Sequence, residues 1–321
     1  MRQMNKFLEA ISLAGSIGIT GHIRPDGDCY GSCLGLYNYI REVFPEKQVS
    51  VYLETLVPEF SFLSRSEEIK TEPQEIVYDL FLVLDCGAAD RLGSFLPLFE
   101  KAKKKIVVDH HISNTSFGQE NYIEPEASST SEIIYTLLEE DKITKEAGEA
   151  LYLGIVHDTG VFKHSCTGKR TMEIAGRLLS LGIPFSRIID ETFYQKTYVQ
   201  NQVLGRCLLE SLLLLDGRVI ASFIDRKTMD FYGARSHDLD GIVDQLRVTK
   251  GAEVAILLHE TAFHEYKVSL RCNTQLDVSR IASYFGGGGH KKAAGCTMSG
   301  SYRDVLTNLC GHIEAAMAEE K

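Results

Sequence analysis

Short apolar runs alternate with longer amphipathic segments along the first half of the chain. Runs rich in β-branched and aromatic residues occupy residues 17–21, 49–53, 80–84 and 105–108. A helical pattern covers residues 30–44, and helical spacing returns from 128 to 181. Strands separated by helical segments are typical of a parallel sheet covered by helices. We therefore expect an α/β fold whose N-terminal sheet is largely parallel and flanked by helices.

The pattern changes after about residue 195. Two strand pairs are expected, at residues 208–215 with 218–224 and at 253–259 with 265–271. An Asp-Gly turn at 216–217 joins the first pair, as in a β-hairpin, and a helical stretch covers 239–247. This half predicts a smaller C-terminal α+β domain with a mixed or antiparallel sheet.

At 321 residues the chain is longer than one typical domain. We place an N-terminal domain at residues 1–190, a linker at 191–205 and a C-terminal domain at 206–321. The first ten residues mix charged and apolar side chains, and no uncharged apolar run reaches membrane length. Neither export nor a membrane contact is expected.

Composition narrows the classes of partner. Hydrophobic residues make up 44% and charged residues 24% of the chain, as in soluble globular proteins. The net charge of −10 has the wrong sign for gripping long duplex nucleic acid, although a short anionic ligand remains compatible with it. Eight cysteines without a disulfide pattern indicate a cytoplasmic protein, and Cys29 and Cys33 are interpreted as buried thiols without chemistry.

Acidic and histidine side chains follow the predicted strands directly. They are His22, Asp26 and Asp28 after the first strand, Asp85 after residues 80–84, the triplet Asp109, His110 and His111 after the fourth strand, and Asp158. Pro25 and Gly27 are expected to tighten the turn at 22–28. One aspartate after a strand is explained equally well by a helix cap or turn, but four such positions favour a common site at the carboxyl ends of the strands.

So many carboxylates around one site repel one another unless cations lie among them. Imidazole and carboxylate ligands without thiolates suit Mn²⁺, with Mg²⁺, Co²⁺ or Fe²⁺ as substitutes. Two such ions can activate a water for hydrolysis of a phosphate ester without a covalent nucleophile. The sequence therefore predicts two metal ions in one active site.

A glycine cluster in the second half carries a second candidate site. Gly287, Gly288 and Gly289 let backbone N–H groups approach an anion, and His290 with Lys291 or Lys292 can add positive charge. For the two lysines, a solvated loop edge is an equally good interpretation.

These motifs together resemble a known family. The ordered elements His22-x-x-x-Asp26-x-Asp28, Asp85, Asp109-His110-His111 and Asp158 are similar to the four motifs of the DHH phosphoesterases. Residues 286–295 resemble the glycine-rich motif of the DHH-associated C-terminal domain. Length and domain content are most similar to the bacterial bifunctional oligoribonucleases and 3′-phosphoadenosine-5′-phosphate (pAp) phosphatases.

The resemblance implies a role for each position. His22 and Asp26 would bind one ion, Asp28, His110 and Asp158 the other, and Asp85 both. His111 would face the substrate as the catalytic donor, with Asp109 orienting the histidines. Arg271 is similar to the family's phosphate-binding arginine, although Cys272 stands where a serine is common, and with Gly287, Gly288, Gly289 and His290 it would bind substrate.

The implied enzyme is a Mn²⁺-dependent hydrolase of short oligoribonucleotides or of pAp. The motifs are equally compatible with a phosphodiesterase acting on cyclic di-AMP or its linear product pApA, whereas a pyrophosphatase of the same superfamily lacks the glycine-rich motif. In a different class, a non-catalytic nucleotide sensor would be expected to have lost a metal ligand, and every position is filled. Short RNA or small nucleotides are the expected partners, and the resemblance allows for a homodimer.

Overall fold

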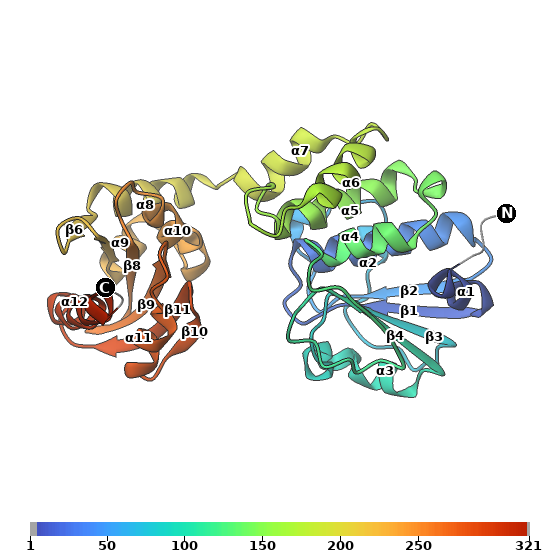
Figure 1. Cartoon of the computed structure of the whole chain (residues 1–321), viewed down its shortest axis with the longest axis horizontal. Helices are drawn as coiled ribbons and strands as arrows, with labels where there is room; N and C mark the ends of the chain where they lie inside the picture. The colour runs from blue at the N-terminus through green and yellow to red at the C-terminus, as the bar shows by residue number, and fades with distance from the viewer. Residues whose placement is uncertain (1–4, 320–321) are drawn as a thin grey trace. The chain divides into compact units, whose positions relative to one another are not determined.

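The computed structural model of the protein describes residues 5–319. The chain divides into two compact units, one ending at Gln195 and one beginning at Lys196 (Figure 1). Within the described residues no helix is both long enough and apolar enough to cross a membrane.

The N-terminal unit contains a five-stranded parallel sheet in the order β2-β1-β3-β4-β5. Its strands are β1 (Ser16–Thr20), β2 (Gln48–Tyr52), β3 (Leu80–Leu84), β4 (Lys104–Asp109) and β5 (Glu120–Ile123). The expected parallel sheet is confirmed, and the short, half-buried edge strand β5 is an addition to it. Its residues Glu120 and Asn121 are polar, which hid the strand from a search for apolar runs.

Helices cover both faces of this sheet. They are α1 (Lys6–Leu13), α2 (Gly27–Val43), α3 (Leu96–Lys101), α4 (Thr130–Leu137), α5 (Lys145–Asp158), α6 (Lys169–Leu179) and α7 (Phe185–Ile189). Figure 1 shows α2, α4 and α5 over one face and α3 over the other. Alternate residues of β3 supply the two cores, because Leu82 packs under α2 while Phe81 packs towards α3. All five residues of β3 are buried, which explains their uninterrupted apolar sequence.

The C-terminal unit contains a six-stranded mixed sheet in the order β10-β11-β9-β8-β7-β6. Its strands are β6 (Leu212–Leu214), β7 (Val219–Ile224), β8 (Val254–Ala262), β9 (Glu265–Cys272), β10 (Gly288–His290) and β11 (Ala293–Ser299). Both expected strand pairs are present as antiparallel neighbours, and β7 with β8 is the one parallel pair among these strands. The expected mixed sheet is therefore confirmed.

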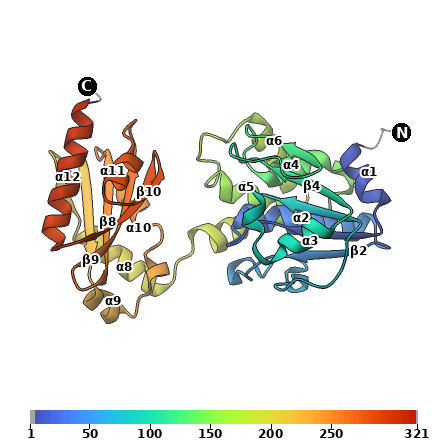
Figure 2. The same ribbon diagram turned by 90° about the horizontal axis from the view of Figure 1, so that it is seen from below.

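Helices α8 (Tyr198–Leu209), α9 (Arg226–Tyr232) and α10 (Ile242–Arg247) pack on one face of this sheet. Helices α11 (Val278–Tyr284) and α12 (Tyr302–Glu319) pack on the other, with α12 running along it (Figure 2). Leu208 and Leu209, expected to begin a strand, instead end α8. Both are exposed, and a short apolar run by itself does not distinguish a helix from a strand.

Most of the expected linker, residues 191–205, lies within helices. A π-helical turn, Asp190–Tyr194, takes in its first residues, and α8 begins at Tyr198. The hydroxyl of Thr197 accepts a hydrogen bond from the N–H of Gln200, whose side chain bonds back to the Thr197 N–H. These polar residues therefore form a capping box at the start of a helix.

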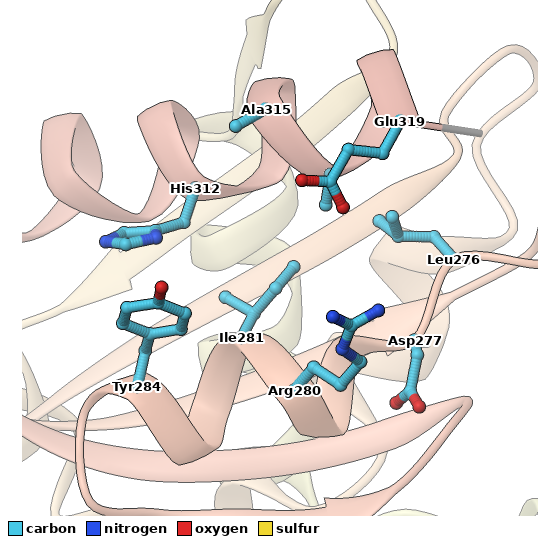
Figure 3. Close-up of a pocket in the computed structure, with 9 residues that line it drawn as sticks. Leu276, Asp277, Arg280, Ile281, Tyr284, His312, Ala315 and Glu319 are labelled. Carbon is cyan, nitrogen blue, oxygen red and sulfur yellow. The ribbon is translucent and has the colours of Figure 1, made fainter. Parts of the chain in front are cut away.

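A pocket of about 340 Å³ lies between α11 and α12 (Figure 3). Arg280 and Tyr284 of α11 face His312 and Glu319 of α12 across it. The rings of Tyr284 and His312 lie 4.6 Å apart. All lining residues of this pocket belong to the C-terminal unit, so it is separate from the cluster of aspartates and histidines in the N-terminal unit.

Candidate metal centre

The acidic and histidine residues singled out in the N-terminal half gather at one edge of the parallel sheet. His22 follows β1, Asp85 directly follows β3, and Asp109 is the last residue of β4. Because these strands are parallel, their carboxyl ends share this edge. Asp158, the last residue of α5, reaches the same place, and its Oδ2 lies 2.9 Å from Nε2 of His110.

The segment from His22 to Asp28 joins β1 to α2. Its left-handed residue is Arg24, with φ of 54°. Asp26 caps α2, and its Oδ1 accepts hydrogen bonds from the backbone N–H groups of Asp28 and Cys29, both at 3.1 Å. Sequence reasoning gave Gly27 the role of tightening the turn, but its φ is not positive. Glycine is needed there because a Cβ would lie 2.2 Å from the ring of His157.

His22 faces two carboxylates. Its Nε2 lies 3.8 Å from Oδ1 of Asp26 and 3.5 Å from Oδ2 of Asp85. Its Nδ1 lies 2.8 Å from the carbonyl oxygen of Ile23, which assigns Nδ1 as the donor and leaves the Nε2 lone pair facing the carboxylates. Burial alone would lower the pKa of His22, but the two carboxylates outweigh it and raise that pKa to about 11. A divalent ion among these three groups can replace the proton.

His110 faces a second set of carboxylates. Its Nε2 lies 3.6 Å from Oδ1 of Asp85, in addition to its close contact with Asp158. Ligand atoms of Asp28, His110 and Asp158 all lie within 4.8 Å of one another. Burial opposes protonation of His110, yet the hydrogen bond that its Nε2 donates to Asp158 and the nearby carboxylates raise its pKa to about 10. These residues offer a second position for a cation.

Asp85 lies between the two sets. Its Oδ2 faces His22, and its Oδ1 faces His110. The side chain is 2% exposed, and the residue adopts the left-handed conformation with φ of 54°. Strained backbone of this kind is concentrated at functional sites. One carboxylate oriented towards both positions is the geometry that a ligand shared by two ions requires.

Asp28 is the most enclosed acid of the cluster. Its Oδ2 accepts a hydrogen bond of 2.6 Å from the N–H of Thr130, and its Oδ1 accepts one of 2.9 Å from Ser131, both at the start of α4. Burial raises its pKa, and the charges of Asp85 and Asp158 raise it further. Buried carboxylates this close together are tolerated when a cation neutralises them. The oxygen and imidazole donors therefore fit hard or borderline divalent ions.

His111 is held by Asp109. Its Nδ1 lies 2.7 Å from Oδ1 of Asp109, whose Oδ2 accepts a 2.6 Å hydrogen bond from the side chain of Asn114. The hydrogen bond to Asp109 raises the pKa of His111. Burial opposes ionisation of Asp109, but the hydrogen bonds from His111 and Asn114 lower its pKa overall. Asp109 thus orients His111 beside the cluster and favours its protonated form.

Two further residues reach this site. Thr130 donates a 3.1 Å hydrogen bond to Oδ1 of Asp85. Cys29, to which the sequence assigned no chemistry, offers a sulfur within 4.8 Å of ligand atoms of His22 and Asp85. The sequence shows only a run of polar residues at 128–132, and the structure shows that all five are buried.

In the C-terminal unit, Arg271 and His290 occupy the same row of the sheet. His290 of β10 pairs with Ala293 of β11, and Ala293 pairs with Arg271 of β9. Paired residues point to the same face, so the side chains of Arg271 and His290 flank a small alanine. Asp244 of α10 accepts a 3.1 Å hydrogen bond from Nε of Arg271. Arg271 and His290 therefore offer an anion two hydrogen-bond donors on one face of the sheet, with the small side chain of Ala293 between them.

Two glycines of this motif, Gly287 and Gly289, are required by close packing. A Cβ at Gly287 would lie 2.2 Å from the carbonyl oxygen of Gly295, and one at Gly289 would lie 2.5 Å from that of Ala293. Gly288 has open space around it. Lys291 donates a 3.1 Å hydrogen bond to the side chain of Gln275, which fits its interpretation as part of a loop edge.

Comparison with known proteins defines the class. Residues 16–155 match the DHH family, N-terminal domain, and residues 216–319 match the DHHA1 domain. Together the two matches take in most of the chain. The chain therefore contains a DHH-family N-terminal domain followed by a DHHA1 domain, and it is a hydrolase.

Among characterised relatives, the chain is similar to the bifunctional oligoribonuclease and PAP phosphatase NrnA of Bacillus subtilis, at 28% identity over 91% of this chain and 92% of the relative. The protein of the same name from Thermus thermophilus is 28% identical over 94% of this chain and 89% of the relative. An exopolyphosphatase-related protein from Bacteroides fragilis has the same fold, with a TM-score of 0.84 at 24% identity and coverage of 98% and 94%.

Proposed function

We propose that this chain is a Mn²⁺-dependent phosphoesterase that hydrolyses short oligoribonucleotides to mononucleotides and removes the 3′-phosphate of pAp. The observation that carries the proposal is Asp85, whose two oxygens face His22 and His110, respectively, from a strained position. The names of the relatives from B. subtilis and T. thermophilus support the choice of substrates.

The proposed ligands divide as the geometry suggests. His22 and Asp26 would hold one ion, Asp28, His110 and Asp158 the other, and Asp85 both. Such a pair of ions supplies an activated water and neutralises charge on the phosphoryl oxygens. Both oxygens of Asp28 already accept backbone hydrogen bonds, and each carboxylate oxygen has a second lone pair for a cation.

The chain's own part in the chemistry is to orient and to move protons. His111, fixed through Nδ1 by Asp109, presents Nε2 to the substrate and donates a hydrogen bond or proton to a phosphoryl or leaving oxygen. Asp109 acts as a positioning residue, because it is fully buried and its carboxylate contacts the side chains of His111 and Asn114.

The net charge of the protein favours short substrates over long ones. A chain with a net charge of −10 cannot supply the many cationic contacts that long nucleic acid requires. Arg271, His290 and the backbone around Gly287–Gly289 are enough for one terminal phosphate. We assign residues 1–190 to catalysis and 206–321 to substrate binding, joined by 191–205. The eight free cysteines favour a cytoplasmic location.

The test compares specific rates on a panel of substrates with Mn²⁺ present. We expect pAp and di- to pentanucleotides to be hydrolysed faster than cyclic dinucleotides and pyrophosphate. Fastest turnover of cyclic di-AMP or pApA would replace this proposal with the phosphodiesterase. Tight binding of nucleotides without Mn²⁺-dependent turnover of any of them would identify a sensor.

A further inference from the structure

Cys29 lies beside the first proposed metal position. It is the third residue of α2, and its backbone N–H is bonded to Asp26, a proposed ligand. Its sulfur, the Nε2 or Nδ1 of His22 and a carboxylate oxygen of Asp85 all lie within 4.8 Å of one another. The three side chains are buried. A single ion can contact three donors at such separations, since metal–sulfur and metal–nitrogen bonds are about 2.3 Å and 2.1 Å long.

The surrounding backbone makes room for this sulfur. At Gly21, the last residue before His22, a Cβ would lie 2.1 Å from Sγ of Cys29. Any larger residue there would push the sulfur away from the end of β1. The nearest other thiol, Cys33, lies one helical turn further along α2, and it is absent from every group of potential metal ligands found among residues 5–319. Of these two buried thiols on α2, Cys29 is the one that lies close enough to His22 and Asp85 to share a metal ion with them.

From this geometry we infer that Cys29 is a ligand of the metal ion held by His22, Asp26 and Asp85, so that the two metal positions differ in chemical character. The position that includes Cys29 carries one soft sulfur donor, whereas the position of Asp28, His110 and Asp158 has only oxygen and nitrogen donors. Binding of the metal displaces the thiol proton to solvent, and no electron is transferred.

The consequence is a difference in metal preference. Thiolate ligands favour Fe²⁺, Co²⁺ and Zn²⁺ over Mn²⁺ and Mg²⁺, while carboxylate and imidazole accept all of them. The Cys29 position should therefore bind Co²⁺ or Zn²⁺ more tightly than Mn²⁺, and the second position should discriminate less. This inference rests on the proposed two-metal centre and refines its chemistry.

Co²⁺ titration of the full-length apoprotein tests it. A sulfur ligand gives Co²⁺ an intense near-ultraviolet charge-transfer band that oxygen and nitrogen ligands do not produce. We expect this band to develop with one of two bound equivalents in the natural protein. It should be lost in Cys29→Ser and kept in Cys33→Ser, the matched control, while Co²⁺ affinity of that position falls about tenfold or more in Cys29→Ser.

Two bound equivalents without the band, or an undiminished band in Cys29→Ser, would overturn the inference and leave the proposed function standing. Failure of the natural protein to bind Co²⁺, Mn²⁺ or Zn²⁺ would remove the metal centre itself. Circular dichroism of both variants checks folding. If Cys29→Ser is unfolded, Cys29→Ala is used, and the band of the natural protein alone still decides whether sulfur binds the metal.

Discussion

The hydroxyl of Thr130 donates a hydrogen bond to Oδ1 of Asp85, while the backbone N–H of Thr130 donates to Asp28. One residue at the start of α4 thus contacts two carboxylates proposed to bind different ions. Hydrogen bonds from a second layer of residues fix the orientation of metal ligands. Thr130 is therefore expected to set the direction of the Asp85 carboxylate.

Thr130→Val keeps the shape of the side chain and removes the hydroxyl. We expect Mn²⁺ affinity to fall about tenfold or more, because Asp85 loses a partner that orients it. Calorimetric titration of Mn²⁺ measures this directly. Thr130→Ser, which keeps the hydroxyl, should bind Mn²⁺ as the natural protein does, and equal affinity of all three proteins would contradict the assigned role.

Asp85→Asn removes one charge and keeps the size and the left-handed conformation, which asparagine tolerates. Mn²⁺-dependent hydrolysis should be abolished because neither position keeps its shared ligand. The free energy of unfolding of the apoprotein should change little, because the relieved repulsion with Asp28 and Asp158 offsets the lost attraction to His22. Asp85→Ala should also be inactive and less stable, because alanine is strained at this φ. Undiminished turnover in either variant would remove Asp85 from the mechanism.

The pH profile of kcat/KM should report the pair of Asp109 and His111. The carboxylate raises the pKa of His111, so His111 stays protonated to a higher pH than a free histidine would. If protonated His111 donates to the substrate, activity falls as pH rises through that pKa. Asp109→Asn should move this alkaline limb to lower pH. An alkaline limb that stays in place would show that a different group limits the rate.

Much of this site could be predicted because parallel strands bring their carboxyl ends together. Buried runs such as β3 mark the strands, and Asp85 and Asp109 follow as the chain leaves the sheet. The contact of Thr130 with Asp85 could not be predicted this way, because the local sequence does not indicate that the start of α4 lies beside the end of β3. The proximity of Cys29 to Asp85 depends equally on packing between separate elements.

Element ends were harder to predict than element types. Residues 208–215 were expected to form one strand, but Leu208 and Leu209 end α8, and Glu210 and Ser211 separate them from β6, which begins at Leu212. Gly27 was assigned to a turn because glycine often serves there, whereas its reason is the ring of His157, which lies far along the chain. Whether such a position requires glycine depends on contacts with distant segments of the chain.

His157, which has no part in the proposed metal centre, is half-buried, and its Nε2 lies 2.9 Å from the hydroxyl of Thr192. Burial lowers its pKa to about 4, from 6.5 in the unfolded chain. Its contribution to stability is therefore full above pH 6.5 and is lost as pH falls towards 4, because the unfolded chain takes up the proton first. That loss should be about 2–3 kcal/mol. In His157→Asn, urea unfolding at several pH values should show a shallower decline in stability, and parallel curves would contradict the assignment.

Arg271→Ala should weaken substrate binding and leave the metals in place. Arg271 lies in the C-terminal unit, in the row that also contains His290, whereas every proposed metal ligand lies in the N-terminal unit. Loss of one charge-assisted hydrogen bond to phosphate is worth about 1.5–3 kcal/mol, so KM for pAp should rise by roughly ten- to a hundredfold. Arg271→Lys should recover part of this, because lysine keeps the charge without the paired N–H groups. Loss of Mn²⁺ from Arg271→Ala would show that the arginine supports the metal centre instead of the substrate.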